Sequence, residues 1–349
     1  MLIYTALFSV LAITGIIGIG LKKHATQCLY AILVVILALF AGCRANGFDW
    51  HSYYEIFKVI HAGGNYEGAQ FVEYGFQFLT LLSPTYRILI FITAIISVPL
   101  TLGGLYKLSP NTFPLLGLLV YFTCFLMPTY MGQIRQGLAL GFVMYAYYYL
   151  WRNHRRKALL MVLIGSLFHI TALIALLIFF PIRKEFSIST YILGFIITYF
   201  ASFLALNLMA AFLQLSSSGI AEKIMYYAMK EHEGLGISST IMVRIATFLI
   251  VIMLNKGKSN QITYISNIYY IGICLYLLLG FSPQLAGRGT YYFAIMEFVL
   301  VPYIAKALKS HKEFCLGATL LIVALSFYRF YAFFSDDFNA FSYIPYLRY

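Results

Sequence analysis

Charged residues are scarce in this sequence. They make up 10% of the 349 residues, whereas a soluble protein carries about 25%. Acidic residues are the rarest, with 12 Asp and Glu against 24 Lys and Arg, and 62% of the chain is hydrophobic. This composition excludes a soluble enzyme, a disordered chain and a nucleic-acid binder. The formal charge of +12 is instead typical of the cytoplasmic loops of a membrane protein.

Cysteine is also scarce, and its spacing fits neither a metal site nor a disulfide framework. The five cysteines are Cys28, Cys43, Cys124, Cys274 and Cys315. All of them lie in or beside apolar runs, so we expect them to act as small packing residues. A disulfide-stapled secreted domain is therefore excluded, and no metal site is predicted.

Long apolar runs fill most of the chain. They lie near residues 2–20, 27–43, 84–106, 112–127, 134–151, 158–180, 190–212, 238–254, 261–284, 288–305 and 315–334. A helix of about 20 apolar residues crosses a hydrocarbon layer of ~30 Å. The alternating pattern of a membrane barrel is absent, and the first run lacks a signal-peptide cleavage site. Helices are therefore expected throughout, because they satisfy every backbone group within lipid.

The predicted fold class is all-α: a polytopic integral membrane protein with one transmembrane domain over residues 1–349. We expect about 10–12 transmembrane or re-entrant helices around an outward-facing cleft. The basic loops should be cytoplasmic, which places both termini, an amphipathic segment near 44–75 and a loop near 213–237 on the outer side. The aromatic tail, residues 341–349, is expected to pack on that side.

The run 158–180 conflicts with this topology, because the loops on both of its sides are basic. Either Arg183 and Lys184 violate the positive-inside rule, or the run folds back as two half-length helices with His169 at the turn. We prefer the second alternative, since re-entrant turns are tolerated where they line a cavity within the protein.

Arginines concentrate on the expected outer side, whereas most lysines fall in the cytoplasmic loops. The outer arginines are Arg44, Arg87, Arg135, Arg244, Arg288, Arg329 and Arg348. A guanidinium binds phosphate through two parallel hydrogen bonds and stays charged when partly desolvated. We expect a functional role for Arg135 and Arg288. Arg87, Arg329 and Arg348 are interpreted as helix-end residues that reach toward the interface.

The strongest motif is Gln133-Ile-Arg-Gln-Gly-Leu-Ala, which opens the run 134–151. A helix N-terminus offers unpaired N–H groups and a positive dipole end, and both favour an anion. Arg135 and Gln136 lie in that first turn, and Gly137 and Ala139 let a helix or a ligand approach closely. A diphosphate is the expected guest.

A second motif, Gly287-Arg-Gly-Thr-Tyr-Tyr-Phe, opens the run 288–305 and repeats this design. It places Arg288 at an outer helix start. Tyr291 and Tyr292 follow it, and a tyrosine can stack on a sugar face while its hydroxyl makes hydrogen bonds. Glu297 lies deeper in the same run and is expected to pair with a buried polar partner.

Two carboxylates lie in the outer segment. Asp49 and Tyr53 share one helix face, so Asp49 could bind a sugar hydroxyl and take its proton; alternatively it is a helix N-cap. Glu73 precedes the third apolar run and either pairs with an outer arginine or contacts substrate.

His169 lies within an apolar run, in the sequence Leu167-Phe-His-Ile-Thr-Ala. An ionisable residue inside a membrane is a functional candidate, although a lone histidine is also often a structural group. No second histidine accompanies it at metal-ligand spacing, so zinc is not expected.

Five segments in one order resemble the EpsG family of Wzy-like bacterial polysaccharide polymerases. They are Arg44…Gly-Phe-Asp…Tyr-Tyr, Glu73-Tyr-Gly-Phe, Ile134-Arg-Gln-Gly-Leu-Ala, Phe168-His-Ile-Thr-Ala and Arg288…Tyr-Tyr-Phe. The resemblance runs from about residue 40 to 305 and is most specific over 133–172. Phe48 departs from the small residue that the family often has before the aspartate.

The resemblance implies a glycosyltransferase at the outer face of the bacterial cytoplasmic membrane. Such enzymes join oligosaccharide repeat units, with donor and acceptor each carried on undecaprenyl diphosphate, into O-antigen, capsule or exopolysaccharide. It implies no metal, nucleotide sugar or other cofactor. The implied partners are these lipid-linked sugars and membrane lipids, together with a chain-length regulator and a flippase.

The predicted roles follow from combining the motifs with this resemblance. Arg135 and Arg288, with Arg44 and Gln136, would hold the diphosphate and stabilise its developing charge. Either Asp49 or His169 would accept the proton of the acceptor hydroxyl. The sugar-binding candidates are Glu73, Tyr53, Tyr291 and Tyr292.

Other classes of membrane protein remain as alternatives. A lipid-linked oligosaccharide flippase should show two related halves, and the sequence shows none. A sugar O-acyltransferase would use an intramembrane histidine facing a cytoplasmic acyl donor, whereas His169 accompanies outer arginines. Oligosaccharide ligases share the proposed chemistry and differ in their acceptor.

Overall fold

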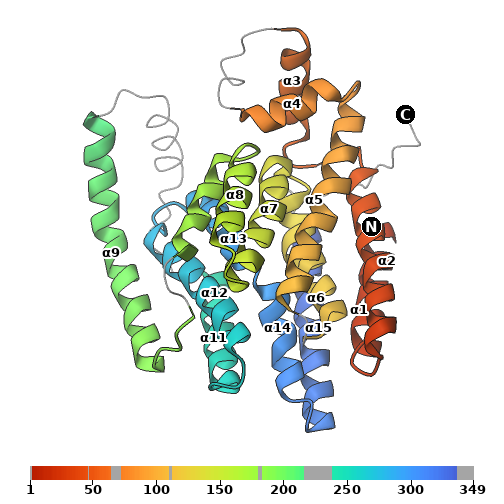
Figure 1. Cartoon of the computed structure of the whole chain (residues 1–349), viewed down its shortest axis with the longest axis vertical. Helices are drawn as coiled ribbons and strands as arrows, with labels where there is room; N and C mark the ends of the chain where they lie inside the picture. The colour runs from red at the N-terminus through yellow and green to blue at the C-terminus, as the bar shows by residue number, and fades with distance from the viewer. Residues whose placement is uncertain are drawn as a thin grey trace. The chain divides into compact units, whose positions relative to one another are not determined.

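The structure is a computed structural model that describes residues 2–45, 47–63, 72–109, 112–179, 183–215 and 238–335 (Figure 1). The chain is 82% helical, and no strand occurs in the described ranges. The protein is thus an all-α polytopic membrane protein, as predicted. Most of the expected outer loop (216–237) and the aromatic tail (336–349, with Arg348) lie outside the described residues.

The chain divides into two compact units. The first unit comprises Met1–Phe179 and Glu297–Tyr349, and the second comprises Phe180–Met296. The helices of the first unit are α1 Leu2–Ile17, α2 Lys23–Gly42, α3 Trp50–His61, α4 Tyr74–Leu82, α5 Tyr86–Leu108, α6 Pro114–Tyr121, the π-helix η2 Phe122–Tyr130, α7 Ile134–Trp151, α8 Arg155–Ser166, the 3₁₀-helix η3 Ile170–Phe179, α14 Glu297–Ala307 and α15 Lys312–Ser335. The helices of the second unit are α9 Ile188–Leu215, α11 Ser239–Asn255, α12 Asn260–Leu278 and α13 Pro283–Ala294.

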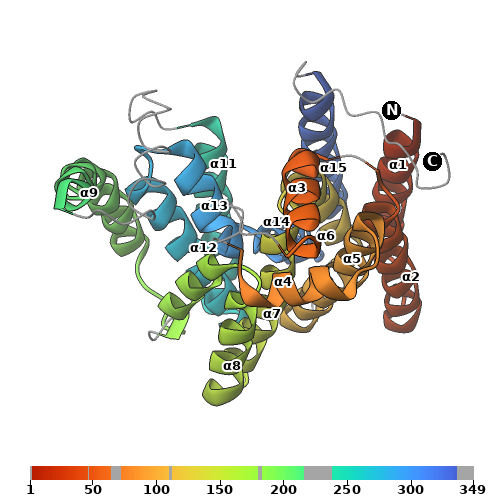
Figure 2. The same ribbon diagram turned by 90° about the horizontal axis from the view of Figure 1, so that it is seen from above.

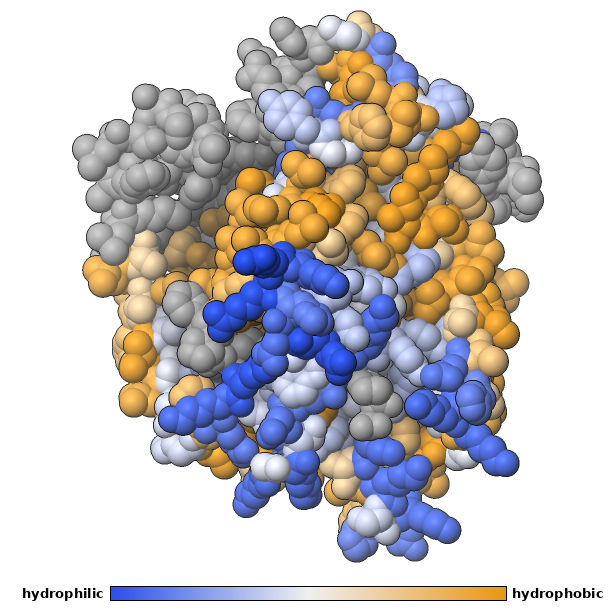
Figure 3. Space-filling model, viewed as in Figure 1, coloured by the Kyte–Doolittle hydropathy of each residue, from blue (hydrophilic) through white to orange (hydrophobic). Residues whose placement is uncertain are grey.

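Five of the described helices are long and apolar enough to cross a membrane: α2, α5, α9, α12 and α15. Exposed apolar side chains lie on α2, α5, α9 and α15, among them Leu320, Leu321 and Leu325 on α15. Figure 3 shows apolar side chains over α5, whereas hydrophilic side chains gather over the turn between α7 and α8. That turn exposes Arg152 and Arg155. A membrane protein is expected to distribute its residues in this way, because lipid removes the cost of exposing apolar surface.

Small residues let α5 and α7 pack closely in the first unit. A Cβ atom at Gly104 would lie 2.7 Å from Cβ of Met144, and one at Gly141 would lie 2.9 Å from Cδ2 of Leu100. Close approach at small residues is the usual basis of helix association within a membrane. Helices α3 and α4 lie at one end of this unit, next to the start of α5 (Figures 1 and 2).

The run 158–180 forms two short helices with a turn between them, as the second alternative predicts. Helix α8 ends at Ser166, residues 167–169 form the turn, and η3 begins at Ile170. The two short helices pack together at Gly165, where a Cβ atom would lie 3.2 Å from the carbonyl oxygen of Ala139 and 3.5 Å from Cβ of Ala172. The prediction that His169 lies in a turn between two short helices is therefore confirmed.

The run 288–305 is not the single helix that we expected. Helix α13 ends at Ala294, residues 295–296 form a turn, and α14 begins at Glu297. Helix α13 also begins early, because Ser282 accepts a hydrogen bond from the Leu285 N–H and Pro283 occupies the first helical position. The expectation that Arg288 lies at a helix start is therefore wrong: Arg288 lies in the middle of α13.

Candidate functional site

The candidate site of the first unit begins with the way α3 is held. Its apolar residues recur at Trp50, Tyr53 and Phe57, which gives the helix one apolar face. The Trp50 and Tyr86 rings lie 4.8 Å apart, and the Tyr86 hydroxyl donates to the Trp50 carbonyl oxygen at 2.8 Å. Tyr86 is the first residue of α5. Helix α3 is therefore fixed to the start of a membrane-spanning helix.

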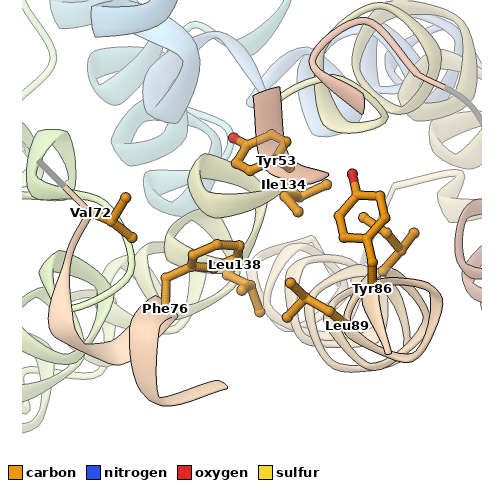
Figure 4. Close-up of a cluster of buried hydrophobic side chains, with 8 residues drawn as sticks. Tyr53, Val72, Phe76, Tyr86, Leu89, Ile134 and Leu138 are labelled. Atoms are coloured by element: carbon orange, nitrogen blue, oxygen red, sulfur yellow. The ribbon is translucent and has the colours of Figure 1, made fainter. Parts of the chain in front are cut away.

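Buried side chains from four helices meet beneath α3. The cluster consists of Tyr53, Val72, Phe76, Tyr86, Leu89, Ile90, Ile134 and Leu138 (Figure 4). It joins α3, α4, α5 and the first turns of α7. Because this cluster packs the starts of three helices around Tyr53, it places the polar residues of those starts close together. The loss of apolar surface to water is the main force that holds such a cluster.

Arg135 and Glu73 form a partly buried ion pair beside this cluster. Nη1 of Arg135 lies 2.8 Å from Oε2 of Glu73, and their side chains are 18% and 14% exposed. The guanidinium carbon also lies 5.8 Å from the ring centroid of Tyr53, within the range of a cation–π interaction. Of the two alternatives for Glu73, this structure contains the pairing with an outer arginine.

The second oxygen of Glu73 binds a different part of the chain. Oε1 accepts a hydrogen bond from the Ile170 N–H at 2.9 Å, at the start of η3. Beside it, the Gly75 N–H donates to the Leu167 carbonyl oxygen at 2.8 Å. A Cβ atom at Gly75 would lie 2.7 Å from that oxygen, so this approach requires glycine. One carboxylate thus connects the start of α7 to the turn that contains His169.

Asp49 occupies the N-cap position of α3, as one alternative predicted, but its side chain makes no capping hydrogen bond. Burial raises the pKa of the Tyr53 hydroxyl above its ordinary value, and the Asp49 carboxylate raises it further, while the Arg135 guanidinium lowers it. The net shift is upward, so Tyr53 stays neutral at physiological pH and can donate a hydrogen bond. Asp49, Tyr53 and Arg135 therefore share one electrostatic environment.

His169 is partly buried in the turn after α8. Its Nδ1 lies 2.7 Å from Oγ1 of Thr171 and accepts a hydrogen bond from the Thr171 N–H at 3.3 Å. Thr171 was not identified from the sequence. A hydroxyl two residues after a histidine was the only available signal, since such a side chain readily bonds to nearby groups of its own turn.

Arg44 and Gln136 are buried rather than open to solvent. The Arg44 side chain, only 2% exposed, donates to the carbonyl oxygens of Ala41 at 2.6 Å and Met131 at 2.7 Å. It thereby joins the end of α2 to the turn before α7. Gln136 is 1% exposed. The diphosphate-binding roles of both residues stay predictions.

The small residues in the first turns of α7 are contacted by other parts of the protein. The Tyr130 ring covers Gly137, and the Ala139 carbonyl faces Gly165. The close approach that these residues were expected to allow is thus made by the protein itself in this structure.

Arg288, Tyr291 and Tyr292 belong to α13 of the second unit. Arg288 is exposed, whereas Tyr291 and Tyr292 are 4% and 0% exposed. Helix α13 packs closely on α12, where a Cβ atom at Gly272 would overlap the Phe293 side chain. The expected cooperation of Arg288 with Arg135, and the sugar-binding roles of the two tyrosines, stay predictions.

A second ion pair lies among the helices of the first unit. Nη1 of Arg329 lies 3.2 Å from Oε2 of Glu297 and 2.6 Å from Sγ of Cys124. The expectation that Glu297 pairs with a polar partner is confirmed, although the Arg329 side chain is 33% exposed rather than buried. The interpretation of Arg329 as a residue reaching toward the interface is wrong, because its guanidinium turns inward to this carboxylate.

The first-unit site contains charged groups and groups that form directed hydrogen bonds. It combines one guanidinium, two carboxylates, a neutral phenol and an imidazole in Arg135, Asp49, Glu73, Tyr53 and His169. Across the parts of the chain that the structure describes, no three His, Cys, Asp or Glu side chains are grouped to hold a metal ion.

Comparison with known proteins gives one match. The model of the EpsG family matches residues 27–347, which is most of the chain. Neither a curated protein nor a solved structure matches it significantly.

Proposed function

The chain belongs to the EpsG family, a Wzy-like polymerase family whose members are membrane proteins of polysaccharide biosynthesis, and we propose on this basis that it is a polysaccharide polymerase. It joins oligosaccharide repeat units carried on undecaprenyl diphosphate at the outer face of the cytoplasmic membrane. The observation that carries the proposal is Arg135, held at the start of α7 by Glu73 and Tyr53.

In the proposed reaction, a sugar hydroxyl of the acceptor unit attacks the anomeric carbon of the donor chain. A carbon–oxygen bond forms there, the bond from that carbon to the diphosphate oxygen breaks, and undecaprenyl diphosphate leaves with the electron pair. The developing negative charge requires a fixed positive partner. Arg135 meets this requirement at a helix N-terminus, where the backbone dipole adds to its charge.

The ion pair with Glu73 is compatible with this role of Arg135. A guanidinium carries five N–H donors, so a phosphate oxygen can join the carboxylate on the same group. Glu73 fixes the direction of the side chain before substrate arrives. Such preorganisation reduces the reorganisation that the reaction would otherwise require.

The acceptor hydroxyl needs a base, and we assign this role to Asp49, one helical turn before Tyr53, where the Tyr53 N–H donates to the Asp49 carbonyl oxygen at 3.0 Å. A positioned base contributes about 10²–10⁴-fold to the rate. The Tyr53 hydroxyl, neutral at physiological pH, donates a hydrogen bond to the sugar. Arg288, which is exposed on α13 of the second unit, stays a candidate for diphosphate binding from the sequence alone.

The proposal is tested by polymerisation with purified components. Wild-type protein in detergent is incubated with its undecaprenyl-diphosphate repeat unit and a chelator, and the products are separated on a gel. We expect a ladder at repeat-unit spacing. Arg135→Ala should reduce its rate by about 10²–10³-fold, the usual effect of removing one charge-stabilising donor; Arg288→Ala should also reduce it.

Arg152→Ala is the matched control, because Arg152 is an exposed arginine at the opposite end of α7. It should leave the ladder unchanged, and all variants should elute from gel filtration as the wild type does. The proposal is overturned if authentic substrate yields no ladder while the same protein in liposomes moves it across the bilayer. Transfer to an unrelated acceptor, without a ladder, would instead indicate a ligase.

A further inference from the structure

The contacts of the His169 ring determine which of its nitrogens carries the proton. Two groups of Thr171 meet the same nitrogen, Nδ1: the backbone N–H at 3.3 Å and the hydroxyl oxygen at 2.7 Å. The hydroxyl can donate or accept, but a backbone N–H can only donate. Both contacts are satisfied together only when Nδ1 offers a lone pair. The neutral ring then carries its proton on Nε2.

We propose that Thr171 is a positioning residue that keeps His169 in the Nε2–H form, so that His169 donates a hydrogen bond to a substrate oxygen while Asp49 acts as the base. This inference rests on the proposed polymerase function. It assigns separate roles to two residues that the sequence leaves as alternatives.

The opposite assignment conflicts with the geometry of the turn. A histidine base that takes a proton at Nε2 begins with its own proton on Nδ1. That proton would point at the Thr171 N–H, and two donors would then face one another across 3.3 Å. The second ring nitrogen commonly sets the form of a histidine in this way.

The turn that carries His169 is held from two sides, which fixes the position of the ring. Oε1 of Glu73 accepts from the Ile170 N–H at 2.9 Å, and the Leu167 carbonyl accepts from the Gly75 N–H at 2.8 Å. The peptide group that follows His169 and the one between Leu167 and Phe168 are therefore held in place. Since Glu73 also holds Arg135, the imidazole donor and the guanidinium share one anchor.

A hydrogen-bond donor at Nε2 matches the charge that develops in the reaction. The acceptor hydroxyl loses its proton to the Asp49 carboxylate, and the electron pair of the breaking bond moves onto the diphosphate oxygen. His169 and Arg135 both donate to this group, and His169 keeps its own proton throughout. The negative oxygens of the lipid-linked diphosphate are thus the ligand for which this donor is suited.

Nuclear magnetic resonance of ring-¹⁵N histidine tests the assignment without any substrate. The His169 signals are identified by their loss in His169→Gln. We expect a protonated Nε2 and an unprotonated Nδ1, and Thr171→Ser should keep this pattern. Thr171→Val removes the closer donor and should shift or broaden the signals. A protonated Nδ1 in the wild type would overturn the proposal.

Activity separates a donor from a base. The amide nitrogen of His169→Gln stands near the position of Nε2 and donates but does not take up a proton, whereas His169→Asn is too short to reach it. We expect the Gln variant to stay within about tenfold of the wild type, and the Asn and Ala variants to lose about 10²-fold.

Equal losses for the Gln and Ala variants would overturn the proposal in favour of a histidine base. Failure of the proposed function itself gives a different result. In that case the wild type forms no ladder, while the resonance measurement still determines the form of His169.

Discussion

Two partly buried ion pairs hold the first unit, and they differ in what surrounds them. In both, an arginine Nη1 meets a glutamate Oε2: Arg135 meets Glu73 at 2.8 Å, and Arg329 meets Glu297 at 3.2 Å. The first pair lies at the ends of helices, among a backbone N–H, a phenol and a histidine turn. The second joins the start of α14 to the side of α15, with the thiol of Cys124 on η2 as its neighbour.

The difference teaches that the same chemistry serves two purposes. A pair whose carboxylate is buried holds helices together, because removing the arginine leaves that charge buried without compensation. The Glu73 pair directs Arg135, the residue proposed to bind the diphosphate, so its removal should change binding and catalysis. We therefore expect the Glu297 pair to control stability and the Glu73 pair to control activity.

The largest effect is expected at the pair of Arg329 and Glu297. Arg329→Met should destabilise the protein by about 3 kcal/mol, because Glu297 is 3% exposed and would keep an uncompensated buried charge. The measurement is the unfolding midpoint in detergent. Arg329→Met combined with Glu297→Ala should cost less than the sum of the two single changes. An additive double variant would contradict the pairing.

A smaller effect, this time on activity, is expected at the pair of Arg135 and Glu73. Glu73→Gln keeps an oxygen for the Ile170 N–H but removes the charge that directs Arg135. We expect polymerisation to fall by a factor of about 10–100, the equivalent of one hydrogen bond to a charged group, with little change in the unfolding midpoint. The measurement is the rate at which the ladder grows.

Glu55→Gln is the control for this change. Glu55 pairs with Lys58 at 2.8 Å on the same outer segment, but both side chains are about half exposed, and such surface pairs contribute little. Its activity should equal that of the wild type. Equal losses for the Glu55 and Glu73 variants would remove the distinction between the two carboxylates.

The smallest effect concerns the Tyr53 ring, which lies beside the pair of Arg135 and Glu73. Tyr53→Phe keeps a ring 5.8 Å from the Arg135 guanidinium and loses only the hydroxyl, so polymerisation should fall by a few-fold at most. Tyr53→Leu removes the ring as well and should cost about 1 kcal/mol more. The two rates are compared at equal protein concentration. If Leu and Phe behave alike, the ring does not help to hold Arg135.

Much of the fold follows from local sequence. The length of the apolar runs predicted the helices. The basic loops on both sides of 158–180 predicted a turn at His169, because both loops should be cytoplasmic and a single span between them would put one of them outside. The start of α13 was also within reach, since Ser282 and Pro283 form a helix-start signal that outweighs the position of Arg288.

The site was harder to predict, because its contacts join distant segments. The pairing of Glu73 with Arg135 stood as one of two alternatives. The burial of Arg44 depends on the Met131 carbonyl, and a backbone acceptor has no signature in the sequence. Asp49 lies at the N-cap as its residue type favours, yet its side chain does not cap, because position alone does not set a side-chain direction.

The hydrogen bond between Arg44 and the Met131 carbonyl constrains the order of assembly. The two residues are 87 positions apart, and α3, α4, α5 and α6 are made between them. We therefore expect Arg44 to stay hydrated at the membrane surface while that stretch is made and inserted, since burying its charge without partners would cost several kcal/mol. The connection between α2 and α3 is then expected to close only after the turn before α7 has formed.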